Sequence, residues 1–199
     1  MRKLVLRLTG LLVGCVLFCC PAWATSLDIV SGILMGATEV SVGGNLYDVQ
    51  FVDGTCAEVY GVCDVAHFTF KTQSDAEAAS TALLSAVFLD GFLGNFDSSP
   101  DLTFGCASIS ECRVITSYGA INATTHLGAL AINRRGPTPP DIVGSTNVSS
   151  AADTTASPFL VYAVWTPSLL VVSEPWSITL LGFGLLALAM FTRTRKGAR

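Results

Sequence analysis

The chain is apolar at both ends. These two ends constrain its location and its domain organisation more than the central part does. Residues 8–18 form a short apolar run behind a basic segment, and residues 176–191 form an uncharged run near the carboxyl terminus. Such segments direct export or membrane insertion and do not belong to a packed core. Between them, residues 25–168 are enough for one domain with its own core.

The amino-terminal end is expected to be a cleaved signal peptide, residues 1–24. Pro21 breaks any helix just before Ala22 and Ala24, whose small side chains suit signal peptidase, so cleavage is expected after Ala24. An alternative is a lipobox that would make Cys15 a lipidated amino terminus. The apolar run before that cysteine would then be only residues 8–12, which disfavours this alternative.

The carboxy-terminal run is expected to be one transmembrane helix, residues 176–191. At helical rise this run spans about 24 Å, slightly less than a hydrocarbon core of ~30 Å. Under the positive-inside rule the basic residues that follow form a cytoplasmic stop and leave the central domain outside. These residues are Arg193, Arg195, Lys196 and Arg199. A plain single-pass membrane anchor would explain the apolar run and the basic residues after it.

Immediately before the apolar run stand Ser173, Glu174 and Pro175. Together with the apolar run, the basic end and the signal peptide, this motif resembles the PEP-CTERM sorting signal of Gram-negative bacteria, except that Ser173 stands where that family usually has proline. The resemblance covers residues 173–199. It implies processing by an exosortase, transient residence in the inner membrane with the domain facing the periplasm, and delivery to the cell surface or the exterior. Proteins of this family are commonly associated with exopolysaccharide and biofilm. No activity for the central domain follows.

Charge excludes one class of partner. Lys71, Arg113, Arg134 and Arg135 are the basic residues between the two ends, against fourteen acidic residues from Asp28 to Asp153, a formal charge of −10. Such a surface repels phosphate backbones, so nucleic acid is not an expected partner.

The pattern of the central domain predicts an α+β fold, mainly antiparallel β with one amphipathic helix at about residues 74–90. A hairpin is indicated by two alternating segments, 39–42 and 46–51, around the turn 43–45. Further strands are expected at 67–70, 112–117 and 127–132, and residues 159–165 are expected to form a buried closing strand. Residues 134–158, rich in Pro, Gly, Ser and Thr, are expected to form a long loop.

For the helix, Ser74 and Glu77 form a capping-box pattern, and Gly91 is the expected stop. Its expected core-facing residues are Ala79, Leu83, Ala86 and Val87.

Four cysteines remain once the signal peptide is removed, and an even count in an exported chain favours disulfides. Three connectivities are possible, and we favour Cys56–Cys63 with Cys106–Cys112 because each closes a short loop. Zinc is the competing interpretation, but the intervals between these cysteines do not match a zinc knuckle. No metal or cofactor is therefore expected.

No catalytic motif is evident. His67 and His126 are isolated in sequence, and the segment Asp97–Asp101 is more typical of a turn than of a calcium loop. We therefore expect a noncatalytic surface or matrix protein whose partners are signal peptidase, exosortase, the membrane and exopolysaccharide. The alternative is a secreted enzyme or ligand-binding module with scattered site residues, held by a plain membrane anchor.

Overall fold

The computed structural model describes residues 24–169. The chain divides into two compact units after Ser168, so Leu169 is the one described residue of the second unit. Ala22, the sorting motif 173–175, the predicted transmembrane helix and the basic stop lie outside the described residues. Within residues 24–169, no helix is long and apolar enough to cross a membrane.

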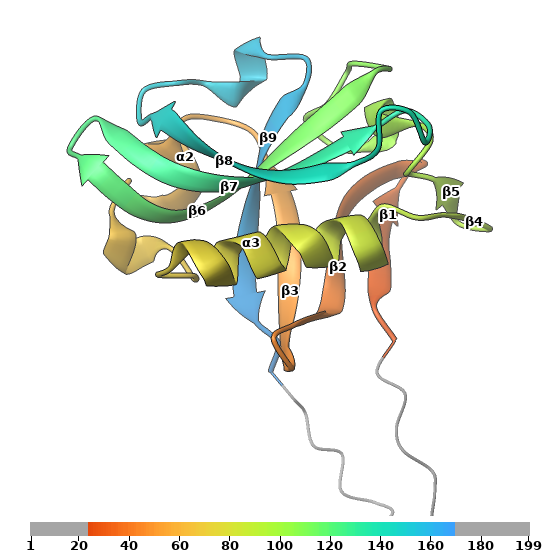
Figure 1. Cartoon of the computed structure of the whole chain (residues 1–199), viewed down its shortest axis with the longest axis horizontal. Helices are drawn as coiled ribbons and strands as arrows, with labels where there is room; N and C mark the ends of the chain where they lie inside the picture. Colours follow the sequence, from red (N-terminus) through yellow and green to blue (C-terminus); the bar gives the residue numbers. More distant parts are fainter. Residues whose placement is uncertain (1–23, 170–199) are drawn as a thin grey trace, which may run out of the picture. The chain divides into compact units, whose positions relative to one another are not determined.

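The first unit is built on one seven-stranded sheet with the order β1-β2-β3-β9-β6-β7-β8 (Figure 1). Neighbouring strands are antiparallel except β6 and β9, which run parallel. The strands are β1 Ser26–Val30, β2 Ile33–Val42, β3 Asn45–Val52, β6 Glu111–Asn122, β7 Thr125–Arg134, β8 Ile142–Ser149 and β9 Leu160–Pro167. A separate two-stranded ribbon pairs β4 Asp90–Gly91 with β5 Gly94–Asn95. The expected mainly antiparallel β domain with one substantial helix is confirmed.

One helix packs against one face of the sheet, as Figure 1 shows. It comprises α3, Gln73–Ala82, and a π-helical turn, Leu83–Val87. Although β2 and β7 are separated by three other strands, α3 contacts both, so the sheet must curl around the helix. The main core fills the space between them, with Ala76, Ala79, Leu83 and Val87 of the helix all fully buried.

The predicted hairpin is present as β2 and β3. Val42 pairs with Asn45, so the turn consists of Gly43 and Gly44, and Asn45 belongs to β3 rather than to the turn. Both glycines have positive φ, 59° and 86°, as a type I′ turn requires. Tyr47 and the two buried residues that alternate with it, Val49 and Phe51, pack into the main core as expected.

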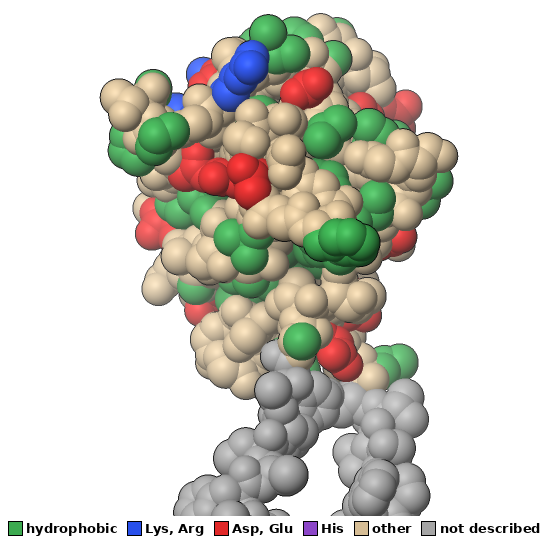
Figure 2. Space-filling view, turned by 90° about the vertical axis from the view of Figure 1, so that its right-hand side faces the viewer, with side chains coloured by type: hydrophobic (Ala, Val, Ile, Leu, Met, Phe, Trp, Pro, Cys, Tyr) green, Lys and Arg blue, Asp and Glu red, His purple; other side chains and the backbone are tan. Residues whose placement is uncertain are grey.

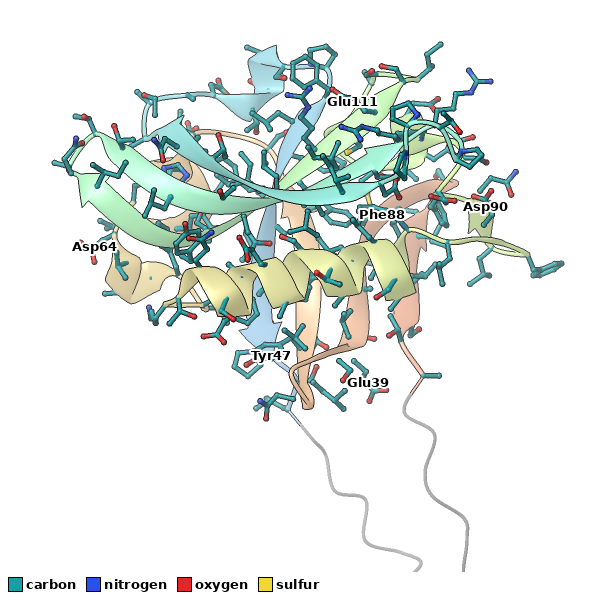
Figure 3. The ribbon with its side chains drawn as sticks, viewed as in Figure 1. Glu39, Tyr47, Asp64, Phe88, Asp90 and Glu111 are labelled. Carbon is teal, nitrogen blue, oxygen red and sulfur yellow. A yellow bond between two sulfur atoms is a disulfide. The ribbon has the colours of Figure 1, made fainter. Side chains whose placement is uncertain are left out.

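The predicted ends of the helix, 74 and 90, are wrong. Thr72 is the N-cap in place of Ser74, because its hydroxyl accepts the N–H of Asp75 at 3.2 Å and donates to that carboxylate at 2.7 Å. At the other end the helix stops at Val87, before Gly91, and Phe88 leaves it to stack on Phe51 with ring centroids 5.7 Å apart. Figure 3 shows Phe88 between the helix and the strands. Core packing ends this helix.

The strand expected at 67–70 is absent from the described structure. His67, where that strand was expected to begin, is instead the last residue of a 3₁₀ turn, η2 Val65–His67. Asp64 caps this turn by accepting the N–H of Ala66 at 2.8 Å. The Lys71 ammonium donates to backbone carbonyls of the same turn. These local polar contacts hold the segment in a turn instead of the expected strand, and His67 is exposed.

The long loop expected at 134–158 is also wrong in part. It contains β8, an edge strand that pairs with β7 along its whole length, and a 3₁₀ turn, η5 Thr154–Ala156. The buried Thr154 hydroxyl accepts the Gly54 N–H at 3.0 Å and donates to Asp53 at 2.9 Å. The segment is therefore tied to the end of β3 and is not a free loop.

Candidate functional site

The face of the sheet opposite α3 carries the candidate sites. Along β9, Val161, Ala163 and Trp165 point into the main core, so Tyr162 and Val164 point to the opposite face. One part of this opposite face is covered by residues 55–68, and the rest is open. The two parts differ in chemistry.

The covered part lies under a short helix, α2 Cys56–Tyr60. Thr55 and Glu58 form a capping box: the Thr55 hydroxyl accepts the Glu58 N–H, and the Glu58 carboxylate accepts the Thr55 N–H at 2.8 Å. A disulfide joins Cys56 to Cys63, with Cα atoms 5.3 Å apart. Beneath them lies a second apolar cluster, whose buried members are Cys56, Phe68, Ile115, Val148 and Tyr162.

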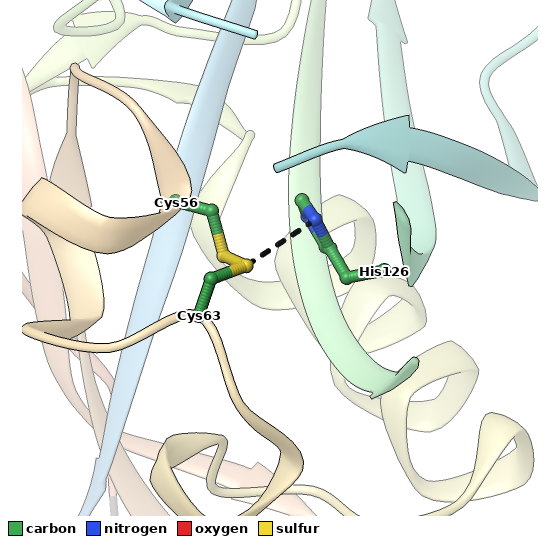
Figure 4. Close-up of side chains that lie close together, drawn as sticks. All are labelled: Cys56, Cys63 and His126. Carbon is green, nitrogen blue, oxygen red and sulfur yellow. Dashed lines mark hydrogen bonds between the residues drawn. A yellow bond between two sulfur atoms is a disulfide. The ribbon is translucent and has the colours of Figure 1, made fainter. Parts of the chain in front are cut away.

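His126 lies buried inside this cluster. Its side chain is 1% exposed, with Nδ1 3.6 Å from Cys63 Sγ (Figure 4) and Nε2 3.5 Å from the Tyr162 hydroxyl. The Phe68 and Tyr162 rings are centred 6.0 and 5.9 Å from the imidazole. Burial lowers the pKa of His126 to about 4, so the imidazole is neutral at physiological pH. We call the group Cys56, Cys63, His126 and Tyr162 the disulfide–histidine centre.

Acidification is expected to destabilise the domain through His126. The folded pKa of about 4 lies below the ordinary value of 6.5, so the unfolded chain binds the proton first as the pH falls. Stability is therefore unaffected above the ordinary pKa and decreases as the pH falls from there to the folded pKa. The loss should reach about 3 kcal/mol, at 1.36 kcal/mol per pKa unit.

The measurement is urea denaturation across this pH range for the native chain and for His126→Gln, which cannot titrate. Carboxylates titrate in both proteins, so the difference between the two slopes isolates the histidine. Parallel pH profiles would contradict the expectation.

The second disulfide joins Cys106 to Cys112, with Cα atoms 5.6 Å apart. Cys112 is fully buried in β6, and Cys106 is buried in the main core, so this bridge fixes the entry of the chain into the sheet. Both disulfides have the connectivity that the sequence analysis favoured. Together they use all four cysteines of the central domain.

The open part of the same face forms a polar groove of about 370 Å³. Its lining comes from four adjacent strands and consists of Asp28, Thr38, Asp48, Gln50, Val164 and Thr166, together with Ala37 and Val49, which also belong to the main core. The register aligns Asp28 with Gly36, Gly36 with Gln50, and Gln50 with Val164. Gly36, which has no side chain, therefore stands between Asp28 and Gln50 in this row.

Two bulges in β2 shape this groove. One lies opposite Asp28 and the other near Glu39, which has a positive φ of 58°. Asp48 holds the second bulge because its carboxylate accepts the Glu39 N–H at 3.0 Å and a hydrogen bond from the Ser168 hydroxyl. Bulges of this kind often lie beside functional sites because they change the direction of side chains. Asp48 supports the groove wall, while Asp28 and Gln50 are exposed.

The surface matches the charge expected from the sequence. Figure 2 shows acidic side chains spread over one face, with a few basic ones near its top.

Within the segment Asp97–Asp101 the chain turns, and the Asp90 carboxylate accepts the N–H groups of Asp97 and Ser98 at 3.0 Å each. Burial raises the pKa of Asp97, and the nearby Asp141 carboxylate adds to this rise.

Sequence reasoning found the cysteines of the disulfide–histidine centre but missed its histidine. His126 is 63 residues from Cys63, and no local pattern connects the two. The groove was missed for a similar reason, because its lining depends on the register of four strands. The predicted signal cleavage residue Ala24 is the first described residue and is exposed.

Comparison with known proteins adds no relative. No protein-family model matches the chain, and searches of curated proteins and of solved structures find no match either.

Proposed function

We propose that this chain is an exported, noncatalytic surface or matrix protein whose carboxy-terminal tail is processed by an exosortase. The observation that supports export is the pair of disulfides, which use every cysteine between the two apolar ends. Structural disulfides form in oxidising compartments outside the cytoplasm. The acidic surface of the domain further supports a soluble exterior location.

The tail is tested by replacing Glu174 and Pro175 together with alanine. We expect this double variant to remain in the inner membrane, because the proposed recognition motif would be lost while the apolar run stays intact. The measurement is fractionation of the native host with tags on both sides of the tail. A matched control is Ser173→Pro, which restores the usual motif and should be released normally.

A host that lacks its exosortase gives the second control. The native chain should then stay in the membrane with its tail attached, as the double variant does. If location and tail length are the same with and without the enzyme, the sorting proposal is wrong and the tail is a plain anchor.

A second candidate function is contact with a neutral polysaccharide through the polar groove. The groove offers carboxylate, amide and hydroxyl groups from several strands, which hydrogen-bond sugar hydroxyls, and its lining contains no basic side chain. An acidic polysaccharide would therefore be repelled. The Asp48 carboxylate already holds the bulge of β2, which favours a binding role over a catalytic one.

Removing two groove side chains tests this function. The double variant Asp28→Ala, Gln50→Ala should bind matrix polysaccharide about thirtyfold more weakly, since each of the two lost hydrogen bonds contributes about 1 kcal/mol. Co-sedimentation with polysaccharide purified from the host measures the change. Ser41→Ala, an exposed position on β2 away from the groove, is the control. Equal binding by both variants would rule out the groove.

A further inference from the structure

Three potential metal ligands meet under α2. Cys56 Sγ, Cys63 Sγ and a ring nitrogen of His126 all lie within 4.8 Å of one another (Figure 4). In the described structure the two sulfur atoms are joined as a disulfide. We propose that reduction of this disulfide converts the disulfide–histidine centre into a Zn²⁺ site, with both thiolates and His126 Nδ1 as ligands.

The spacing fits a tetrahedral ion. Zinc lies about 2.3 Å from sulfur and about 2.0 Å from nitrogen, so two such ligands should be about 3.5 Å apart. The observed distance from Cys63 Sγ to His126 Nδ1 is 3.6 Å. Once the S–S bond is broken, the sulfur atoms can separate to the roughly 3.8 Å that the same geometry requires. The nitrogen ligand therefore already stands where the ion needs it.

Charge also favours this ion. The site is buried: His126 is 1% exposed, and Cys56 is fully buried in the second apolar cluster. Two thiolates and one neutral imidazole around Zn²⁺ form a complex with no net charge. Such a complex avoids the large cost of placing an unpaired charge in an apolar interior.

The histidine is held firmly. His126 lies in β7, paired with Ala120 of β6 and Val148 of β8, so its backbone is fixed on both sides. Its second nitrogen faces the Tyr162 hydroxyl at 3.5 Å. In metal sites such a partner orients the ring and selects the tautomer that leaves the ligating nitrogen free. Cys63 is partly exposed, which gives a reductant and the ion a way in.

Formation of the site begins with a two-electron reduction of the disulfide. A dithiol reductant is oxidised to its own disulfide, the Cys56–Cys63 bond breaks, and two electrons and two protons pass to the cysteine sulfurs. Zn²⁺ then replaces the two thiol protons, which go to solvent. His126 binds through the Nδ1 lone pair and keeps its proton on Nε2.

Cobalt serves as the probe of metal binding. Co²⁺ occupies tetrahedral zinc sites, and it absorbs visible light when thiolates bind it. The full chain is reduced with a dithiol, which is removed without oxygen before Co²⁺ is added. We expect a thiolate–cobalt band that Zn²⁺ abolishes, and no band before reduction. For His126→Gln the affinity should fall at least about tenfold, because loss of an outer-shell partner alone costs tenfold or more.

The double variant Cys56→Ser, Cys63→Ser is the matched control, since it keeps every other cysteine of the chain. It should show no band. The proposal is overturned if this variant binds cobalt as well as the native chain does. It is also overturned if His126→Gln binds equally, if the unreduced chain gives the same band, or if the reduced native chain gives none.

Discussion

Gly36→Ala is expected to destabilise the domain by about 3 kcal/mol or more, or to prevent folding, because overpacking against fixed atoms is costly. A Cβ at this position would lie 2.1 Å from the Val49 carbonyl oxygen. That oxygen belongs to the backbone of β3, which is held between β2 and β9. Neither β2 nor β3 can move without breaking backbone hydrogen bonds of the sheet, so the clash with the added methyl group cannot be relieved.

Gly144→Ala is the matched control for this prediction. Gly144 also lies in a strand of the sheet, but a Cβ there meets no atom within 4 Å. We expect its stability to equal or slightly exceed that of the native chain, since alanine is the better strand residue of the two. Urea denaturation followed by circular dichroism measures both variants. Equal stability of the two would show that β2 and β3 are not packed as closely as described.

Trp165→Ala is expected to cost about 4 kcal/mol, a typical value for deletion of a buried aromatic side chain. Trp165 is 3% exposed and lies in the central strand β9. Its ring packs against Phe70 and Tyr47, with centroids 5.7 and 6.4 Å away, and its indole N–H donates to the Thr116 hydroxyl at 3.1 Å. Because small domains are stable by only about 5–15 kcal/mol, this loss is a large share of the total.

Two further substitutions separate packing from hydrogen bonding. Trp165→Phe keeps most of the apolar volume but leaves the buried Thr116 hydroxyl without its donor, and should cost about 1–3 kcal/mol. Thr166→Ala, at the exposed position next to it, should change stability by less than about 0.5 kcal/mol. If alanine at 165 is no worse than phenylalanine, the aromatic packing around this residue does not stabilise the domain.

Local features of the fold could be predicted from the sequence. Gly43 and Gly44 supply the positive φ that only a tight hairpin turn needs, and the apolar segment 159–165 is too continuous for a half-exposed strand. The cysteine pairs were predictable because each closes a short loop. In these cases the physical cause lies within a few residues of its effect.

Features set by distant contacts could not be predicted in this way. The edge strand β8 is rich in Ser, Thr and Asn, so its sequence resembles that of a loop. It is a strand because its backbone pairs with β7, not because its side chains are buried. The parallel pairing of β6 with β9 joins segments far apart in the chain. The same holds for His126, whose partners come from α2, from the segment after it and from β9.

The place of β9 in the sheet bears on the export that we propose for this domain. The strand at the middle of the sheet is the last strand among the described residues and ends at Pro167. Until it arrives, β3 and β6 have no common neighbour, so the sheet exists only as two separate halves with exposed edges. A chain that crosses a membrane from its amino terminus must therefore thread nearly its whole folding unit before this strand can insert. If the domain is exported as we propose, this topology would delay completion of the sheet until translocation is almost complete, so the chain would stay unfolded while it passes through a narrow pore.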